Sequence, residues 1–358
     1  MKQLTIVTAL AIGLGSLATS AQALPVTFST FVTQAAIDGA EAGQNNTIGF
    51  TYAGNKFVGS LYLGANNFQL YSTDLTGGSV TAFGLPMSGA AGETVLAASL
   101  GHSGFAAGDI YSSPANSSIY HYANSGGSPS LFGNVPDGAV VRQIFFDPGS
   151  NFGGEMLVAT NAGHIYSFSS LGIATLVATV TDAFGNPIDI EGLDIASTVF
   201  GSKSGSLLVT SETTGSLYAV DPISHIVSIV ATGLTEAETV SVVPLNLGSS
   251  LNPVEGFYVA NYPVNIQKAA AAEFNSYLGD AIVTEELGSL SNVYDIHWDG
   301  TNFVQTLIGS LANQSEDGIF VTAQRIHDVN PTPEPLTISL FGAGLVGAVA
   351  MRRRKKSA

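Results

Sequence analysis

A pair of one apolar and one aromatic residue recurs along this chain at an interval of about 49 residues. Each pair opens a short β-rich segment, and a second β-rich segment precedes it by roughly eight or nine residues. Successive pairs are 49, 46, 52 and 102 residues apart, and the last value is twice 51. A further pair is therefore expected near Ile266, which makes six units. The observed pairs are Leu70-Tyr71, Ile119-Tyr120, Ile165-Tyr166, Leu217-Tyr218 and Ile319-Phe320.

Four strands per unit at this period are typical of a β-propeller, in which each blade has two apolar faces that only its neighbours can cover. We therefore predict an all-β fold, a β-propeller of six four-stranded blades, with five or seven blades as alternatives. An array of β-sandwiches is a further alternative, but its units need about 100 residues.

The fifth unit and the closure of the ring need separate predictions. The fifth unit is predicted to contain strands at 256–259 and 265–268, followed by a short helix in the alanine run 269–272. The segment 47–52 resembles 293–298, five periods later. This resemblance predicts that the chain begins inside a blade and that its first and last strands pair to close the ring.

The chain between residues 24 and 330 is acidic and contains no cysteine. It has 26 acidic and only 5 basic residues, so it should repel nucleic acid and anionic lipid. Charged residues make up 11% of the whole chain, against about 25% in a typical globular protein. Without cysteine, disulfides, thiol catalysis and cysteine-based zinc sites are excluded, and a large apolar core must supply the stability.

Both ends of the chain differ from this body. At the start, Lys2 precedes an apolar run from Leu4 to Leu17 and a small-residue site at 21–23, which together predict a signal peptide over residues 1–23. A buried first helix is the alternative. Near the end, an uncharged run of 16 residues, 336–351, would span roughly 24 Å as a helix, slightly less than a bilayer core.

A rigid tripeptide precedes this apolar run, and a basic cluster follows it. The tripeptide is Pro333, Glu334 and Pro335, and the cluster should stay on the cytoplasmic side of a membrane. An ordinary tail anchor or a terminal strand is the alternative. The basic cluster consists of Arg352, Arg353, Arg354, Lys355 and Lys356.

In this order, the three elements over about the last 26 residues resemble the PEP-CTERM sorting signal of exopolysaccharide-producing Gram-negative bacteria. The resemblance implies a membrane-anchored precursor that an exosortase-type processing enzyme cuts near the Pro-Glu-Pro site, which leaves the protein at the cell surface or outside the cell. Exopolysaccharide or other surface proteins would be its partners. The resemblance says nothing about the activity of the body. The chain is therefore predicted to comprise a signal peptide (1–23), a propeller-like domain (24–330) and a sorting and anchor segment (331–358).

Four charged residues also recur at the interval of the repeat. Glu93, Arg142, Glu191 and Glu238 lie 49, 49 and 47 residues apart, each two positions before an apolar residue. Equivalent positions in successive blades form a ring around the axis, and Tyr294 takes the fifth place by its apolar pattern. One hypothesis is a site for Ca²⁺ or a sugar. The alternative, that Arg142 pairs with the glutamates and joins the blades, is favoured because one arginine among carboxylates weakens a cation site.

The leading interpretation of function is a non-enzymatic binding or structural protein without a cofactor. The competing interpretation is a secreted Ca²⁺-dependent lactonase or glycan hydrolase, because segment 190–194 (Ile-Glu-Gly-Leu-Asp) resembles the Glu-Gly-Leu segment of sugar-lactonase-like propellers. A third candidate is an acid–base trio of Asp295, His297 and Asp299, which share one face of a predicted strand. Asp299-Gly300 is typical of a turn, which argues against the trio.

Overall fold

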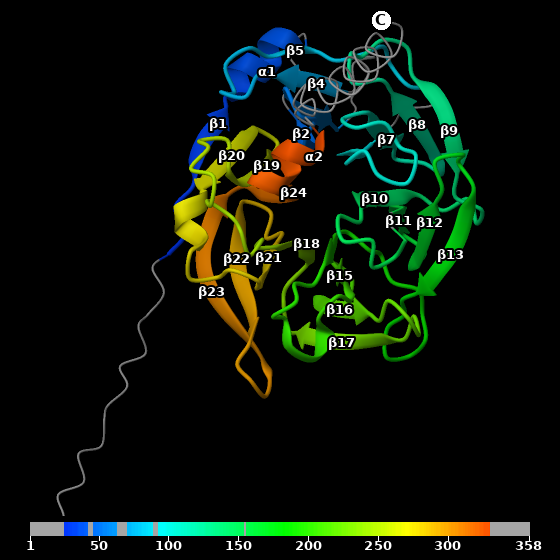
Figure 1. Cartoon of the computed structure of the whole chain (residues 1–358), viewed down its shortest axis with the longest axis vertical. Coiled ribbons are helices and arrows are strands. Elements are labelled where there is room, and N and C mark those ends of the chain that lie inside the picture. The colour runs from blue at the N-terminus through cyan, green and yellow to red at the C-terminus, as the bar shows by residue number, and fades with distance from the viewer. Residues whose placement is uncertain (1–24, 42–45, 63–69, 89–91, 154, 330–358) are drawn as a thin grey trace, which may run out of the picture.

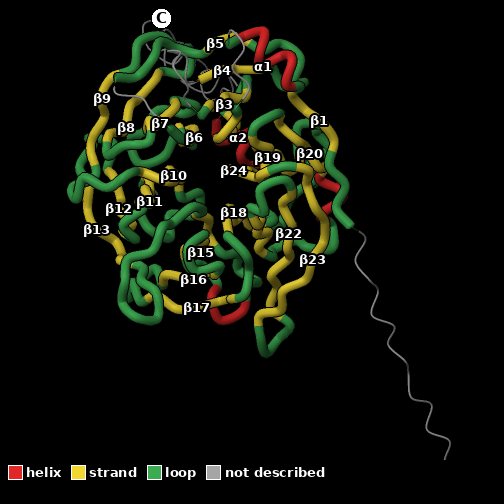
Figure 2. Tube along the Cα trace, turned by 180° about the vertical axis from the view of Figure 1, so that it is seen from behind, coloured by secondary structure: helices red, strands yellow, loops and turns green. Residues whose placement is uncertain are grey.

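The computed structural model describes residues 25–41, 46–62, 70–88, 92–153 and 155–329. These residues form six four-stranded sheets arranged as the blades of a propeller (Figure 1). The innermost strands of neighbouring blades contact one another all the way round, so the ring is closed, as the view from behind also shows (Figure 2). The prediction of an all-β, six-bladed propeller is confirmed. The predicted signal peptide and the sorting and anchor segment lie outside the described residues.

Blades I to IV are each built from one continuous stretch of chain, and their strands run from the axis outward in sequence order. Blade I contains β2 (Thr47–Tyr52), β3 (Phe57–Leu61), β4 (Leu70–Thr73) and β5 (Thr81–Ala82); blade II contains β6 (Thr94–Ala98), β7 (Ile110–Pro114), β8 (Ser118–Tyr122) and β9 (Ser130–Asn134); blade III contains β10 (Val141–Phe146), β11 (Met156–Thr160), β12 (His164–Phe168) and β13 (Ala174–Thr179); blade IV contains β14 (Leu193–Ile195), β15 (Leu207–Ser211), β16 (Ser216–Val220) and β17 (Val227–Thr232).

Blades V and VI are interleaved instead of consecutive, and blade VI is assembled from three separate parts of the chain. Its outermost strand, β1, pairs antiparallel with β20, and its innermost strand, β24, pairs with β19. From the axis outward, blade V contains β18 (Ala237–Val242), β21 (Ala281–Glu285), β22 (Leu290–Trp298) and β23 (Phe303–Ala312), and blade VI contains β24 (Gln314–Val321), β19 (Gly256–Tyr262), β20 (Asn265–Ala270) and β1 (Ser29–Val32).

This interleaving corrects three predictions about the end of the chain. The strands near residues 256 and 266 belong to blade VI, not blade V. The first and last strands lie in the same blade but do not pair with each other. Segment 293–298 lies on β22, the third strand of blade V, so it is not equivalent to the innermost strand β2.

The recurring apolar–aromatic pair marks the third strand of a blade. In blades II, III and IV a register irregularity between the third and fourth strands falls inside the pair, and in blade V the same irregularity falls between Val293 and Tyr294. Val293-Tyr294 is therefore the equivalent pair of blade V. Ile266 lies on the third strand of blade VI, whereas Ile319-Phe320 lies on its innermost strand.

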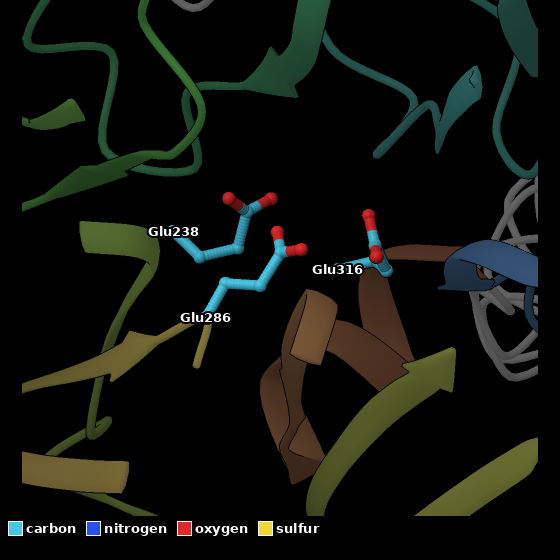
Figure 3. Close-up of side chains that lie close together, drawn as sticks. All are labelled: Glu238, Glu286 and Glu316. Carbon is cyan, nitrogen blue, oxygen red and sulfur yellow. The ribbon is translucent and has the colours of Figure 1, made fainter. Parts of the chain in front are cut away.

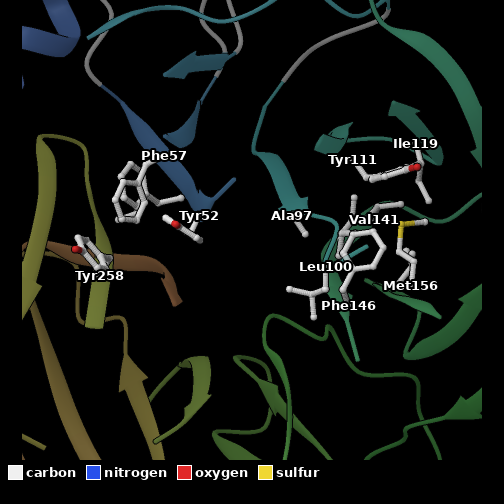
Figure 4. Close-up of a cluster of buried hydrophobic side chains, with 14 of the residues drawn as sticks. Tyr52, Phe57, Ala97, Leu100, Tyr111, Ile119, Val141, Phe146, Met156 and Tyr258 are labelled. Atoms are coloured by element: carbon white, nitrogen blue, oxygen red, sulfur yellow. The ribbon is translucent and has the colours of Figure 1, made fainter. Parts of the chain in front are cut away.

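The core lies between the blades, where the second strand of each sheet is covered on both faces. Strands β3, β7, β11, β15 and β21 are buried at every position, while the outermost strands β5, β9, β13 and β17 are largely exposed. The second strands accordingly have near-continuous apolar sequences instead of alternating ones. Figure 4 shows two groups of these side chains, one around Tyr52, Phe57 and Tyr258 and one around Tyr111 and Phe146.

An aromatic cluster joins blades I and VI where the ring closes. The Phe50 and Phe57 rings stack at 5.0 Å, and Phe57 lies 4.6 Å from Tyr258 of blade VI. Phe31 of β1 packs against Tyr258 with the ring centroids 4.8 Å apart. Burying one such ring stabilises the fold by about 1.5–3 kcal/mol. The cluster therefore fastens the N-terminal strand to the last blade.

Helices are few and short in the described part of the chain. They are α1 (Gln34–Ala40), which begins with Thr33 accepting a hydrogen bond from the Ala36 backbone, α2 (Ala323–Val329), and two 3-10 turns at Gly201–Lys203 and Ala271–Phe274. The second turn overlaps the alanine run in which a short helix was predicted. Among the described residues no helix has the length and apolar character needed to cross a membrane.

Candidate functional site: the acidic mouth of the propeller axis

One end of the propeller axis is a small cavity lined by charged residues from five of the six blades. Each residue lies close to the start of an innermost strand. In the sixth blade, blade I, Ile48 and Gly49 line the cavity instead. We call this cavity the acidic mouth. Its charged residues at equivalent positions are Glu93, Arg142, Glu191, Glu238 and Glu316.

The structure therefore brings the four predicted ring residues together around one cavity. The prediction for the next place was wrong, because Tyr294 lies on β22, away from the innermost strands. The position is occupied by Glu316 of β24, which is the innermost strand of blade VI.

Arg142 neutralises one side of the acidic mouth, which we call the paired side. Its Nε and Nη2 atoms donate to the two carboxylate oxygens of Asp189 at 3.0 and 2.7 Å, and its Nη1 donates to Glu93. Its Nε also lies 3.5 Å from Oε1 of Glu191. The predicted contacts of Arg142 with Glu93 and Glu191 are thus present, and Asp189 adds a two-point contact that the sequence register did not indicate.

The opposite side, which we call the open side, consists of Glu238, Glu286 and Glu316. One carboxylate oxygen of each lies within 4.8 Å of the corresponding oxygens of the other two. Figure 3 shows the Glu238 and Glu286 side chains next to each other, with Glu316 to one side of them. Glu286 accepts a hydrogen bond from Gln314 Nε2. Within the described residues, the carboxylates of Glu238 and Glu316 accept no hydrogen bond and form no ion pair.

Burial and mutual repulsion raise the pKa values on the open side. Burial, followed by the charges of Glu191, Glu316 and Glu286, raises the pKa of Glu238 well above its usual range. Burial and neighbouring carboxylates likewise raise the pKa of Glu316 well above the usual range and that of Glu286 to about 7. Burial also raises the pKa of Glu191, although Arg142 opposes the shift. The acidic mouth thus holds carboxylates that lack a compensating positive charge.

Glu286 and a further acid, Glu212, occupy equivalent places just after the second strands of their blades. Glu286 directly follows β21, and Glu212 directly follows β15, the equivalent strand of blade IV. The charge of Glu212 contributes to the raised pKa of Glu286. A search for acids after the predicted second strands could have found Glu212 but not Glu286, because β21 was not among the predicted strands.

The axis narrows at Gln143 and Asp317, which line both the acidic mouth and a second cavity of about 180 Å³ beyond it. Asp317 accepts hydrogen bonds from the backbone N–H groups of Phe50 and Gly318 at 2.9 and 2.8 Å, and Gln143 Nε2 lies 3.5 Å from it. The second cavity is mainly apolar, and Arg325 of α2 lies among its lining residues. The two ends of the axis therefore differ sharply in chemistry.

The segment resembling sugar-lactonase-like propellers has a structural reason for its glycine. A Cβ atom on Gly192 would lie 2.5 Å from Thr210 Oγ1 and 2.7 Å from the backbone nitrogen of Val240 in the next blade. Asp194 accepts hydrogen bonds from the backbone N–H groups of Val242 and Ile195, both at 2.7 Å. Gly192 and Asp194 thus hold blades IV and V together.

The third candidate, on blade V, has different members from those predicted. His297 Nδ1 lies 2.8 Å from Asp295 Oδ2, but Asp299 accepts hydrogen bonds from the Thr301 and Asn302 backbone in the turn that follows. The charge of Asp295 acts instead on Asp280, which directly precedes β21. Burial, and then the charge of Asp295, raises the pKa of Asp280 to about 7. This group is a carboxylate pair beside a histidine.

No family model and no curated protein matches this chain. Among solved structures, the nidogen/laminin complex is similar at a TM-score of 0.44 and 13% identity, covering 76% of this chain and 85% of that one. The Dos1 propeller is similar at a TM-score of 0.44 and 11% identity over 79% of this chain and 65% of that one. A structural genomics protein of unknown function from Bacteroides thetaiotaomicron reaches 0.46 and 12%, covering 81% and 69%. Likeness at this level carries no argument about function.

Proposed function

We propose that this protein is an exported cell-surface or extracellular-matrix protein whose propeller binds a ligand at its acidic mouth without catalysing a reaction. The observation that carries the binding role is the open side, where three carboxylates converge without a positive partner among the described residues. Propellers present such sites on a rigid closed ring, so a ligand meets preformed geometry.

Export and sorting rest on the two ends of the sequence. The leader over residues 1–23 would direct the chain across the inner membrane. The apolar run and basic cluster would hold it there until an exosortase-type enzyme acts near Pro333, Glu334 and Pro335. The released propeller would lack the basic cluster and carry a strongly negative charge, which suits a protein that stays soluble among matrix polysaccharides.

Cell fractionation tests this part of the proposal. In a host that carries an exosortase-type enzyme, the unaltered chain should reach the surface and matrix fractions. A variant with Pro333, Glu334 and Pro335 replaced by alanine should remain in the inner membrane as the longer precursor. A matched control replaces Pro331 with alanine, outside the tripeptide, and should behave like the unaltered chain. A cytoplasmic location, or identical fractionation of all three chains, would contradict the proposal.

A secreted Ca²⁺-dependent lactonase or glycan hydrolase is the competing function. The observation that favours it is Glu191, whose Oε1 is buried at the mouth without a hydrogen-bond partner among the described residues. Assays on lactones and glycans in the presence of Ca²⁺ separate the two functions. Turnover that Glu191→Ala abolishes would establish the enzyme, whereas ligand binding without turnover supports the binding protein.

A further inference from the structure

The open side of the acidic mouth has the dimensions of a metal coordination shell. Its three carboxylates come from β18, the turn after β21, and β24, so strands of two blades converge on one point. Oxygens bound to one Ca²⁺ lie 2.3–2.6 Å from the ion, so two ligands in a shell are separated by at most roughly 5 Å. The spacing within 4.8 Å on the open side fits a single ion.

Glu238 provides an independent sign of a missing partner. Its side chain faces the acidic mouth, and only 6% of the residue is exposed. No described residue donates a hydrogen bond to its carboxylate or pairs with it. A buried carboxylate without a partner is costly, and proteins normally satisfy it with a positive group or a metal ion.

The described basic residues are committed elsewhere. Arg142 is held by Glu93 and Asp189 on the paired side. Lys56, Lys203 and Lys268 donate to Asn124, Ser228 and Pro253, respectively, and Arg325 lines the second cavity. Among the described residues no basic side chain is left to pair with the open side, so its carboxylates can be neutralised only by protons or by a bound cation.

The chemistry of the ligands selects the ion. Three carboxylates without histidine or cysteine favour a hard cation over zinc or copper. Ca²⁺ accepts six to eight oxygens in irregular geometry, whereas Mg²⁺ requires a near-ideal octahedron. The three glutamates leave several positions of the shell for water or for the hydroxyl groups of a sugar.

We infer that Glu238, Glu286 and Glu316 bind one calcium ion at the acidic mouth. The inference deepens the proposed function, on which it rests, by assigning a ligand to the open side. It also reverses the preference drawn from the sequence, because Arg142 occupies only the paired side and leaves these three carboxylates to the metal.

Calorimetric titration of the purified full chain in detergent, first stripped of metal with a chelator, tests the inference. We expect one Ca²⁺ per chain and at least 100-fold weaker binding in Glu238→Gln. Glu316→Gln should lose a similar amount, and it serves as the second variant should Glu238→Gln fail to fold by circular dichroism. The matched control is Glu93→Gln, which removes the same charge from the paired side and should change the affinity less than 10-fold.

Terbium luminescence gives a second readout at the same site. Tyr262 pairs with Gln314 across β19 and β24, and Gln314 donates to Glu286, so Tyr262 lies near the open side and can sensitise a bound lanthanide. We expect Tb³⁺ emission that Ca²⁺ displaces and that Glu238→Gln removes, and exchange of Tyr262 for phenylalanine should keep Ca²⁺ binding.

Three results would overturn the inference. The first is that the unaltered chain does not bind Ca²⁺ at millimolar concentration. The second is that Glu93→Gln and Glu238→Gln lose equal amounts of Ca²⁺ affinity. The third is that the unaltered chain binds Mg²⁺ at least as tightly as Ca²⁺. Failure of the proposed function is distinguishable, because it would appear as mislocalisation in the fractionation experiment while the purified chain still bound Ca²⁺.

Discussion

The two sides of the acidic mouth start from the same register and reach opposite electrostatic states. On the paired side, Arg142 lies between Glu93, Asp189 and Glu191, and each of these carboxylates lies within 3.5 Å of its guanidinium group. On the open side, Glu238, Glu286 and Glu316 face one another without a cation among the described residues. The difference shows that repeating a position around a propeller repeats its geometry but not its charge balance.

This asymmetry arises because one blade has an arginine where four others have a glutamate. Blades II, IV, V and VI carry glutamate at the equivalent position, and blade III carries Arg142. A guanidinium group spans two carboxylates with directed hydrogen bonds, so it can neutralise its neighbours but not residues across the axis. The paired side is therefore suited to holding blades together, and the open side is suited to holding an ion.

Removal of Arg142 should produce the largest effect. In Arg142→Met, three carboxylates of the paired side lose the only cation that contacts them among the described residues, and the free energy of unfolding should fall by about 3–5 kcal/mol. Urea denaturation measures the change. Lys203→Met is the matched control, because Lys203 donates only to Ser228, and it should cost less than about 1 kcal/mol. A loss in Arg142→Met no larger than in this control would show that the paired side does not stabilise the ring.

Neutralising one acid on each side should change stability in opposite directions when Ca²⁺ is absent. Asp189→Asn weakens the two-point contact with Arg142 and should cost about 1–3 kcal/mol. Glu316→Gln relieves repulsion on the open side and should stabilise the protein by about 1 kcal/mol at pH 8. Urea denaturation in a chelator measures both, and a change of the same sign in the two variants would contradict the contrast between the sides.

Calcium should stabilise the open side alone. At a free concentration of 100 times its dissociation constant, a ligand that binds only the folded state adds about 2.7 kcal/mol to the free energy of unfolding. We expect this gain in the unaltered chain and in Asp189→Asn, and no gain in Glu238→Gln. Thermal unfolding with Ca²⁺ or with chelator measures it, and an undiminished gain in Glu238→Gln would place the ion elsewhere.

The sequence repeat predicted the architecture correctly for those blades that are built from one continuous stretch of the chain. In blades I to IV, the apolar–aromatic pairs marked the third strands at a nearly constant interval. The number of blades was right, but the assignment of strands to the last two blades was wrong, because β19 and β20 follow β18 of blade V in sequence yet belong to blade VI. This insertion separates Glu238 from Glu316 by 78 residues, far from the interval of 49. Ile319-Phe320 then fell on the expected interval by coincidence, on an innermost strand.

Only those site residues that recur at the interval of about 49 residues could be predicted from the sequence. Glu93, Arg142, Glu191 and Glu238 share a register, so their meeting at the axis could be expected. Glu286 lies outside that register, in a turn after a second strand, and only the fold brings it next to Glu238. Asp189 was missed for a related reason, because it reaches Arg142 from the loop before β14.

A third acidic group, far from the ring register, shows what happens when carboxylates converge beside a histidine. Burial, and then the charge of Asp295, raises the pKa of Asp280 to about 7, and His297 Nδ1 lies 2.8 Å from Asp295. An acid with a raised pKa in the folded state binds its proton more tightly than the unfolded chain does. Its contribution to stability is therefore complete below about pH 4 and is lost as the pH rises through about 7.

Asp280→Asn should remove this dependence, because an amide of nearly the same size does not titrate. In a chelator, the unaltered chain should melt at a lower temperature at pH 8 than at pH 5, and the gap should be smaller in the variant. Because Asp280 is only half-buried, solvent screening limits the difference to about 2 °C. Scanning calorimetry at the two pH values measures it. An unchanged or wider gap in Asp280→Asn would mean that Asp280 does not bind its proton more tightly in the folded state, and that other carboxylates account for the pH dependence.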